Sequence, residues 1–284
     1  MTAVTELTKK PIHLNKTKIT GLPYTVLGVL FIAIMLFPIY WMVNTSLQPN
    51  GATVLPSWFP IKPDLSGYVN ALAQQGPNLL TSLIVALGSV VLSLVIASPA
   101  AYALSHFKVP GTNLVLFGIL ITQMIPGIVV ANALYTAYNN LGLLNSIGGL
   151  ILADSAHSIP FAIIVLRAFL QSLSPSVLDA ARVDGAGHVR VFWSIVLPLS
   201  RNALITAGLF TFLSAWGDFL FALTLTTTDA VRPITLGLYQ YIGESVTNWS
   251  SVMATGVLAS LPALILLVIA QKYIASGTSA GSMK

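Results

Sequence analysis

The feature that most constrains this chain is the recurrence of long apolar runs. Six runs are separated by short polar stretches, and each is long enough to cross a hydrocarbon core about 30 Å thick as a helix. Only 7% of the 284 residues are charged, whereas soluble domains carry about 25%. We therefore predict an all-α, polytopic membrane protein with six transmembrane helices. The predicted spans are Tyr24–Val43, Leu79–Leu104, Leu114–Tyr135, Ile147–Leu170, Ala203–Leu225 and Ser251–Ala270.

The first run follows a basic stretch, as the apolar region of a signal peptide does. It is too long for such a region, and no clear small-x-small cleavage site follows it. We expect it to remain as a helix, kinked near Pro38, and we expect the third span to break near Pro126. The predicted organisation is a polar tail over 1–21, a transmembrane domain over 22–274 and a polar tail over 275–284, with no second folded domain.

The distribution of positive charge predicts which side of the membrane each loop occupies. Six spans place both termini on one side, together with 11 of the 13 Lys and Arg residues, and leave 2 on the other. Because cytoplasmic loops are enriched in Lys and Arg, we expect both termini to be cytoplasmic in a bacterial plasma membrane. The 11 are Lys9, Lys10, Lys16, Lys18, Lys108, Arg167, Arg182, Arg190, Arg201, Lys272 and Lys284, and the 2 are Lys62 and Arg232.

An external loop is expected over residues 48–77, which are rich in Pro and Gly. It carries Trp58, Phe59 and Tyr68. These aromatic residues suit either contact with a partner protein or an aromatic belt at the membrane surface, and the sequence does not choose between them.

The longest break in the apolar pattern is Leu178–Pro198, on the predicted cytoplasmic side. Ser174 followed by Pro175 predicts the start of a helix, because Ser caps N-termini and proline fits the first helical position. Gly185 predicts a left-handed C-cap about three turns later. A second short helix is expected from about His188, with the chain turning back at Pro198.

The first of these helices is amphipathic. Val177, Leu178 and Ala181 share one face, while Asp179, Arg182 and Asp184 project elsewhere. A short amphipathic helix between two long apolar segments suits a docking surface better than a catalytic pocket.

Three motifs in this loop carry a family resemblance. Asp179-Ala180-Ala181, Asp184-Gly185-Ala186 and Ile195-Val196-Leu197-Pro198 resemble, at matching spacing, the EAA loop of ABC-importer permeases. The chain departs from that pattern with Asp179 in place of glutamate and with Arg201 after Ser200, where proline is common. The resemblance implies a cytoplasmic coupling-helix loop over 174–200 that binds an ATPase.

Further segments are similar to the maltose-type, carbohydrate-uptake branch of that family. They include Trp216-Gly217-Asp218-Phe219, the run from Met253 to Pro262 and the end from Gly277 to Lys284. The resemblance implies half of a translocation pore that works by alternating access, with a second permease subunit, two cytoplasmic ATP-binding subunits and an extracytoplasmic solute-binding protein as partners. The implied coupling residues are Val177, Leu178, Asp179, Ala180, Ala181, Arg182, Asp184, Gly185 and Ala186, with Val177, Leu178 and Ala181 filling an apolar cleft on the ATPase.

The chain carries no pattern for chemistry of its own. It has no Gly-Lys dipeptide and hence no Walker motif, so ATP and Mg are expected only on the partner ATPases. It has no Cys, and its 4 His residues lack metal-ligand spacing. We therefore expect neither an enzyme nor a metal site, and no nucleic-acid partner; the surroundings of the spans are membrane lipid.

Three ionisable residues fall at membrane depth, namely Asp154, His157 and Asp218. Such residues usually face a water-filled cavity or a partner. One hypothesis is that His157 and Asp218 approach each other or jointly line the outer half of a translocation path, to which Asp154 and Trp216 also belong. The alternative is that Asp154 lies in water near the outer mouth while His157 satisfies a helix–helix contact.

Two other functions remain open from the sequence. The permease could carry a solute other than a sugar. A secondary transporter could instead use Asp154, His157 and Asp218 as an ion or proton relay, but the EAA-like loop would have no role in it.

Overall fold

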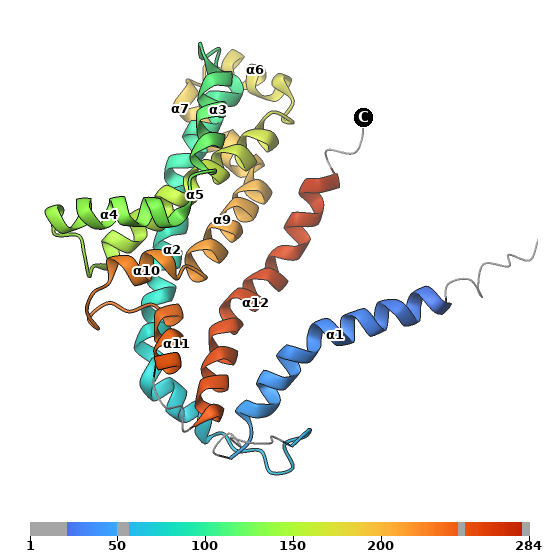
Figure 1. Cartoon of the computed structure of the whole chain (residues 1–284). Coiled ribbons are helices and arrows are strands. Elements are labelled where there is room, and N and C mark those ends of the chain that lie inside the picture. The colour runs from blue at the N-terminus through green and yellow to red at the C-terminus, as the bar shows by residue number, and fades with distance from the viewer. Residues whose placement is uncertain (1–21, 50–56, 244–247, 280–284) are drawn as a thin grey trace, which may run out of the picture.

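The structure is a computed structural model that describes residues 22–49, 57–243 and 248–279 (Figure 1). Within these ranges it is helical and has no strand. The predicted tail over 1–21, residues 50–56 of the predicted external loop, residues 244–247 and the last residues, 280–284, lie outside the described part. The helices are α1 (Leu22–Ser46), α2 (Ser66–His106), α3 (Thr112–Thr122), α4 (Gly127–Leu141), α5 (Ile147–Leu170), α6 (Pro175–Val183), α7 (His188–Val191), the π-helix η2 (Phe192–Val196), α8 (Leu197–Leu199), α9 (Arg201–Trp216), α10 (Leu220–Leu225), α11 (Ile234–Gly243) and α12 (Trp249–Ser279).

Four helices, α1, α2, α5 and α12, are long and apolar enough to cross a membrane. Two bent helix pairs also meet the same criteria when each pair is taken together. They are Thr112–Thr122 with Gly127–Leu141, and His188–Leu199 with Arg201–Trp216. Counting each pair as one span gives six spans. The all-α membrane fold predicted from the apolar runs is thus confirmed. The fourth span has the predicted bounds, because Ser146 caps α5 by accepting a hydrogen bond from the Gly149 N–H at 3.0 Å.

The second span begins earlier than the apolar pattern indicates. Helix α2 starts at Ser66, so the last part of the predicted external loop, 66–77, is helical. The Asp64 carboxylate starts this helix by accepting hydrogen bonds from both the N–H and the hydroxyl of Ser66, each at 2.8 Å. These bonds favour the ionised form and lower the pKa of Asp64.

The aromatic residues of the predicted external loop pack against the C-terminal end of α1. The Trp58 ring lies 5.6 Å from that of Trp41, and the Phe59 ring lies 6.4 Å from that of Tyr40. Trp58 and Phe59 nevertheless stay 64% and 70% exposed. This arrangement is typical of an aromatic cluster at a membrane surface.

The third span is broken where Pro126 predicts it. Helices α3 and α4 meet at 91°, and α4 lies crosswise to α2 (Figure 1). At about 1.5 Å per residue, the 11 residues of α3 extend roughly 16 Å. Helix α3 is therefore only about half as long as a hydrocarbon core of about 30 Å is thick.

The fifth span, expected to be one helix over Ala203–Leu225, is also broken, and that expectation was wrong. Helix α9 ends at Trp216, and the separate helix α10 begins at Leu220. The carboxylate of Asp218 satisfies N–H groups at the start of α10, which allows the chain to change direction without a proline. Figure 1 shows α10 lying crosswise, beside α4.

Two helix ends also differ from the prediction. The second helix of the predicted coupling loop begins at His188 as expected, but it continues through η2 and Pro198 to Leu199. The chain turns at Ser200 instead, where the following helix departs at 76°. Helix α12 continues to Ser279, beyond the expected start of the polar tail at 275.

Helix α2 forms the centre of the bundle and packs against α5, α9 and α12. Small residues allow the close approach of α2 to α5, because the Ser155 hydroxyl donates to the Ser89 carbonyl at 3.4 Å and Gly88 faces Ile151. Helix α1 leans away from this bundle and packs against α12 (Figure 1). Its apolar window is otherwise uncovered by this chain.

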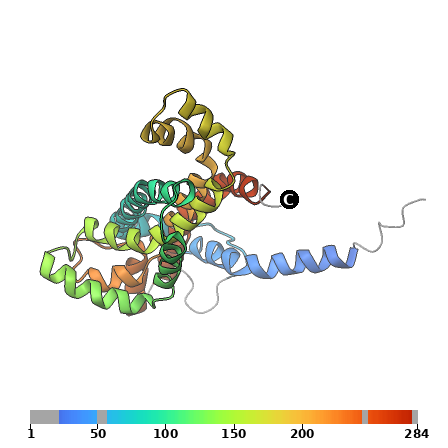
Figure 2. The ribbon, with the colours of Figure 1, turned by 90° about the horizontal axis from the view of Figure 1, so that it is seen from above.

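The loop helices lie at opposite ends of the molecule. Helices α6 and α7 lie at one end of α2, and α11 lies near the other (Figure 1). Seen from above, the segment containing α6 and α7 stands off from the bundle (Figure 2). The two polar loops that flank the fifth span therefore face opposite sides of the membrane, as a single crossing requires.

Candidate functional site

Helix α6 is formed by the two local signals that the sequence contains. Ser174 is its N-cap, with extended backbone, and Pro175 is the first helical residue. Gly185 ends the helix in the left-handed region at φ +80°. The Ala186 N–H donates to the Ala181 carbonyl and the Gly185 N–H to the Arg182 carbonyl, each at 3.0 Å. This pair of bonds is a Schellman motif, so the predicted C-cap is confirmed.

The apolar face of α6 points into its own chain. Leu178 is 3% exposed and Ala181 is 8% exposed, and both belong to the core formed by α2, α5, η2 and α9. The prediction that Val177, Leu178 and Ala181 fill a cleft on an ATPase stays a prediction, although the last two are covered by this chain. Val177 lies off this face and remains 44% exposed. Within this chain, α6 lies against α7, and Leu178 and Ala181 join it to the apolar cluster.

The outward side of α6 carries the charged residues. The Arg182 guanidinium lies 3.5 Å from the Asp179 carboxylate, and the two side chains are 41% and 66% exposed. Ala180, Asp184 and Gly185 are exposed beside them, whereas Ala186 packs partly against the core. An exposed ion pair contributes only about 0–1 kcal/mol to the fold. These side chains are therefore available to bind another protein.

At membrane depth, two of the three ionisable residues lie beside Phe221. Asp154 and His157 lie on α5, and Asp218 lies in the break before α10. The His157 ring lies 6.0 Å from that of Phe221, whose N–H donates to the Asp218 carboxylate at 3.3 Å. Asp154 is 5% exposed, while His157 is exposed. The approach of His157 to Asp218 stays a prediction, and Asp154 is covered by this chain.

Asp218 also has a structural task that the sequence pattern did not reveal. Its carboxylate oxygens accept hydrogen bonds from the N–H groups of Phe221 at 3.3 Å and Ala222 at 3.0 Å. Its carbonyl accepts a hydrogen bond from the Thr235 hydroxyl at 2.6 Å. A carboxylate at a helix N-terminus satisfies donors that lipid would leave unpaired.

Trp216 is buried within this chain. It is 7% exposed, stacks on Phe212 with ring centres 5.6 Å apart, and donates its indole N–H to the Ala259 carbonyl at 2.9 Å. Trp216 therefore joins α9 to α12, and its assignment to the translocation path stays a prediction.

A hollow of about 220 Å³ opens beside His157. Helices α5 and α9 form its walls, and Gln123 closes one side by donating to the His157 carbonyl at 3.2 Å. Apart from His157, the residues of this site could not be predicted from the sequence, because they come from three segments that are distant in the chain and share no local motif. The lining residues are Gln123, His157, Ser158, Phe161, Phe210, Thr211 and Ser214.

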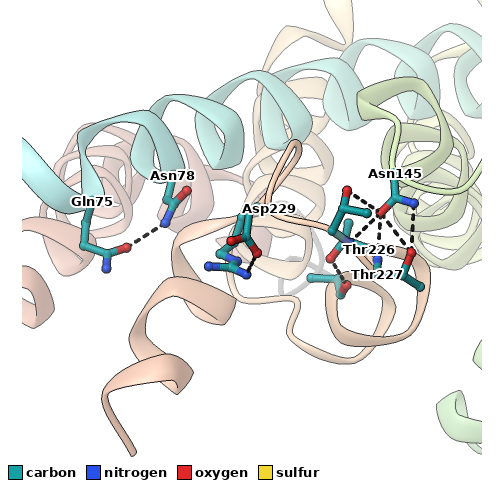
Figure 3. Close-up of polar contacts among 9 residues, drawn as sticks. Gln75, Asn78, Asn145, Thr226, Thr227 and Asp229 are labelled. Carbon is teal, nitrogen blue, oxygen red and sulfur yellow. Dashed lines mark hydrogen bonds and ion pairs between the residues drawn. The ribbon is translucent and has the colours of Figure 1, made fainter. Parts of the chain in front are cut away.

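Asn145, in the turn between α4 and α5, is tied to the segment that follows α10 (Figure 3). Its side-chain oxygen accepts from the N–H groups of Thr227 at 2.7 Å and Thr228 at 2.9 Å, and its amide donates to the Thr227 hydroxyl at 2.9 Å. Asn145 holds a positive φ of 55°, which Asn tolerates better than most residues. On neighbouring segments, Asn78 bonds to Gln75, and Asp229 pairs with Arg232.

Comparison with known proteins now identifies the family. The profile of the binding-protein-dependent transport system inner membrane component matches residues 89–280. The chain belongs to this family. The sulfoquinovosyl glycerol transport system permease protein of Agrobacterium fabrum is 34% identical over 253 residues, covering 88% of this chain and 89% of the relative. The trehalose/maltose transport system permease protein of Thermococcus litoralis is 32% identical, covering 91% and 95%.

A solved structure agrees with this assignment. A bacterial ABC transporter involved in the import of the acidic polysaccharide alginate contains a chain with a TM-score of 0.79 and 26% identity, and the match covers 93% of this chain and 99% of that one. The chain described here is thus an ABC-transporter permease of the inner membrane, not an enzyme. The secondary transporter considered from the sequence gains no support.

Proposed function

We propose that this permease conducts a carbohydrate as one half of an ATP-driven import pore. The relatives that it resembles serve sulfoquinovosyl glycerol and trehalose/maltose transport, and the similar solved transporter imports alginate. The proposed partners are a second permease subunit, two cytoplasmic ATP-binding subunits and an external solute-binding protein. The termini and the α6 loop lie in the cytoplasm, in agreement with the distribution of 11 and 2 basic residues.

The observation that carries this proposal is the division of α6 into two faces. Leu178 is seated in the core of this chain, whereas the Asp179–Arg182 pair faces outward at the end of the molecule. A partner that pulls on the outward side moves α6 together with the core to which Leu178 belongs. The proposed ATPase contacts are Val177, Asp179, Ala180, Arg182 and Asp184, with Gly185 and Ala186 fixing the turn. Leu178 and Ala181 act as the anchor.

The proposed translocation path passes Asp154, His157 and Asp218. Two broken spans flank these residues, and the binding sites of transporters commonly form where membrane helices are interrupted. Buried ionisable residues at such a place are costly in lipid and are found where they face a cavity or a partner.

Co-purification from mild detergent tests the proposed assembly. Tagged wild-type chain is compared with Asp179→Ala and with Asp229→Ala, which removes the matching i,i+3 pair on the opposite side. We expect the wild type and Asp229→Ala to co-purify with an ATPase and a second permease. For Asp179→Ala, the affinity for the ATPase should fall at least about tenfold, which corresponds to about 1.4 kcal/mol of binding free energy. Absence of any ATPase from the wild-type preparation contradicts the proposal.

A further inference from the structure

The hollow beside His157 has the features of a ligand site, and the proposed path alone does not explain them. Two of its lining hydroxyls, those of Ser158 and Thr211, have no hydrogen-bond partner although the residues are 6% and 1% exposed. Buried hydroxyls are normally paired. Hydroxyls on comparable helical turns pair with their own backbone, as Thr206 does with the Asn202 carbonyl at 2.8 Å.

Aromatic rings form the apolar part of the same wall. Phe161 of α5 and Phe210 of α9 meet edge to face, with ring centres 5.4 Å apart at 70°. They remain 40% and 43% exposed, so ring surface is accessible beside the hydroxyl groups. The electron-rich face of an aromatic ring attracts the weakly positive C–H groups on one face of a sugar ring. Apolar rings next to a few polar groups are the usual composition of a small-molecule site.

The size of the hollow limits its ligand. Its volume is about 220 Å³, whereas sites for drug-sized ligands span about 300–1,000 Å³. The space therefore suits one sugar ring rather than a whole oligosaccharide. Its depth agrees with a transport site, because Ser158 is the twelfth of the 24 residues of α5 and lies at the middle of that span.

The charges nearby disfavour an acidic sugar. His157 lies in the wall, and Asp154 on the same helix and Asp218 in the break before α10 add two carboxylates. Helices α3, α4 and α10 contain no Lys or Arg, and those of α5 and α9, Arg167 and Arg201, lie near the helix ends. No Lys or Arg of these helices is therefore placed to balance an acidic sugar against the two carboxylates.

We propose that the hollow lined by Gln123, His157, Ser158, Phe161, Phe210, Thr211 and Ser214 binds one uncharged sugar unit of the cargo. This inference rests on the proposed function, since it gives the pore a carbohydrate-binding site within this subunit. Its residues come from α5, α9 and the end of α3, so the shape of the site depends on the bend between α3 and α4.

The test measures binding to the purified permease–ATPase complex without its solute-binding protein. The probes are methyl glycosides of glucose, galactose and mannose, with glucuronate as the acidic sugar, and the readout is the thermal midpoint. We expect at least one neutral glycoside to raise the midpoint by about 3 °C at saturation, and glucuronate to have no effect. The hollow variant, Ser158→Ala with Thr211→Val, loses this shift.

The matched control is Thr206→Val with Ser260→Ala, which removes two hydroxyls that bond to their own helices. It should keep the full shift. The inference is overturned if no neutral glycoside shifts the wild type, if the hollow variant responds equally, or if glucuronate stabilises as well as the neutral sugars. In each of those cases the importer assignment still holds if the ATPase co-purifies with the permease. If no ATPase co-purifies, the proposed function itself is contradicted.

Discussion

The α6 loop and the membrane centre both place charged residues in an otherwise apolar chain, but they use them differently. At α6, the Asp179–Arg182 pair is exposed, and a buried leucine holds the helix in place. At the centre, Asp218 is partly buried and caps α10 through two hydrogen bonds. Charge is therefore dispensable for folding in the loop and is part of the fold at the centre. Substitutions should separate function from stability in the first region and combine them in the second.

The largest effect should come from the anchor of α6. Leu178→Ala removes a side chain that is 3% exposed, and such truncations cost about 2–5 kcal/mol of unfolding free energy. We expect a loss of about 3 kcal/mol together with weaker ATPase capture, measured by denaturant unfolding in mixed micelles and by pull-down. Val177→Ala, at a residue 44% exposed, is the control for the unfolding measurement alone, because Val177 is itself a proposed ATPase contact. Equal destabilisation by the two substitutions would show that α6 is not seated by Leu178.

The next largest effect should come from Asp218, whose carboxylate is part of the fold, in contrast to the exposed carboxylate of Asp184. Asp218→Ala leaves two N–H groups of α10 unpaired, and loss of an N-terminal cap costs about 0.5–2 kcal/mol. We expect a value near 2 kcal/mol, with a smaller loss in Asp218→Asn, which keeps one acceptor oxygen. Asp184→Ala, at an exposed carboxylate of the loop, should leave the unfolding free energy unchanged. If it destabilises as strongly as Asp218→Ala, the contrast between the two regions does not hold.

The smallest change in stability should accompany a large change in coupling. Gly185→Val places a β-branched residue at φ +80°, at a cost of about 1–2 kcal/mol. No atom lies within 4 Å of the added Cβ, so the effect comes from the backbone alone. We expect the ratio of sugar transported to ATP hydrolysed to fall. Gly185→Asn should restore most of the coupling, because Asn tolerates this conformation. Unchanged coupling in the valine variant would remove Gly185 from the coupling mechanism.

Much of the fold could be predicted because its signals are local. Long apolar runs predicted the spans, and Ser174, Pro175 and Gly185 predicted both ends of α6. The break at Gly217–Phe219 could not be predicted in this way. It contains no proline, and the bonds that stabilise it join Asp218 to residues of the next helix and to Thr235.

The membrane-depth residues were only partly predictable for the same reason. Their cost in lipid identified Asp154, His157 and Asp218 as unusual, without showing what each contacts. The burial of Trp216 depends on α12, and the hollow depends on residues contributed by three segments. Helical periodicity placed Val177 on the same face as Leu178 but could not say where that face ended.

The turn at Ser200 makes the preceding segment a lever. His188–Leu199 forms a continuous rod of 12 residues, about 18 Å long at 1.5 Å per residue, and meets α9 at 76°. A rotation of about 10° at Ser200 displaces the far end of such a rod by about 3 Å. In the reverse direction, a displacement of that size at the α6 end becomes a small angular change of α9. The wall of the hollow that carries Phe210, Thr211 and Ser214 would rotate with α9, so a displacement at the α6 end would change the shape of the hollow.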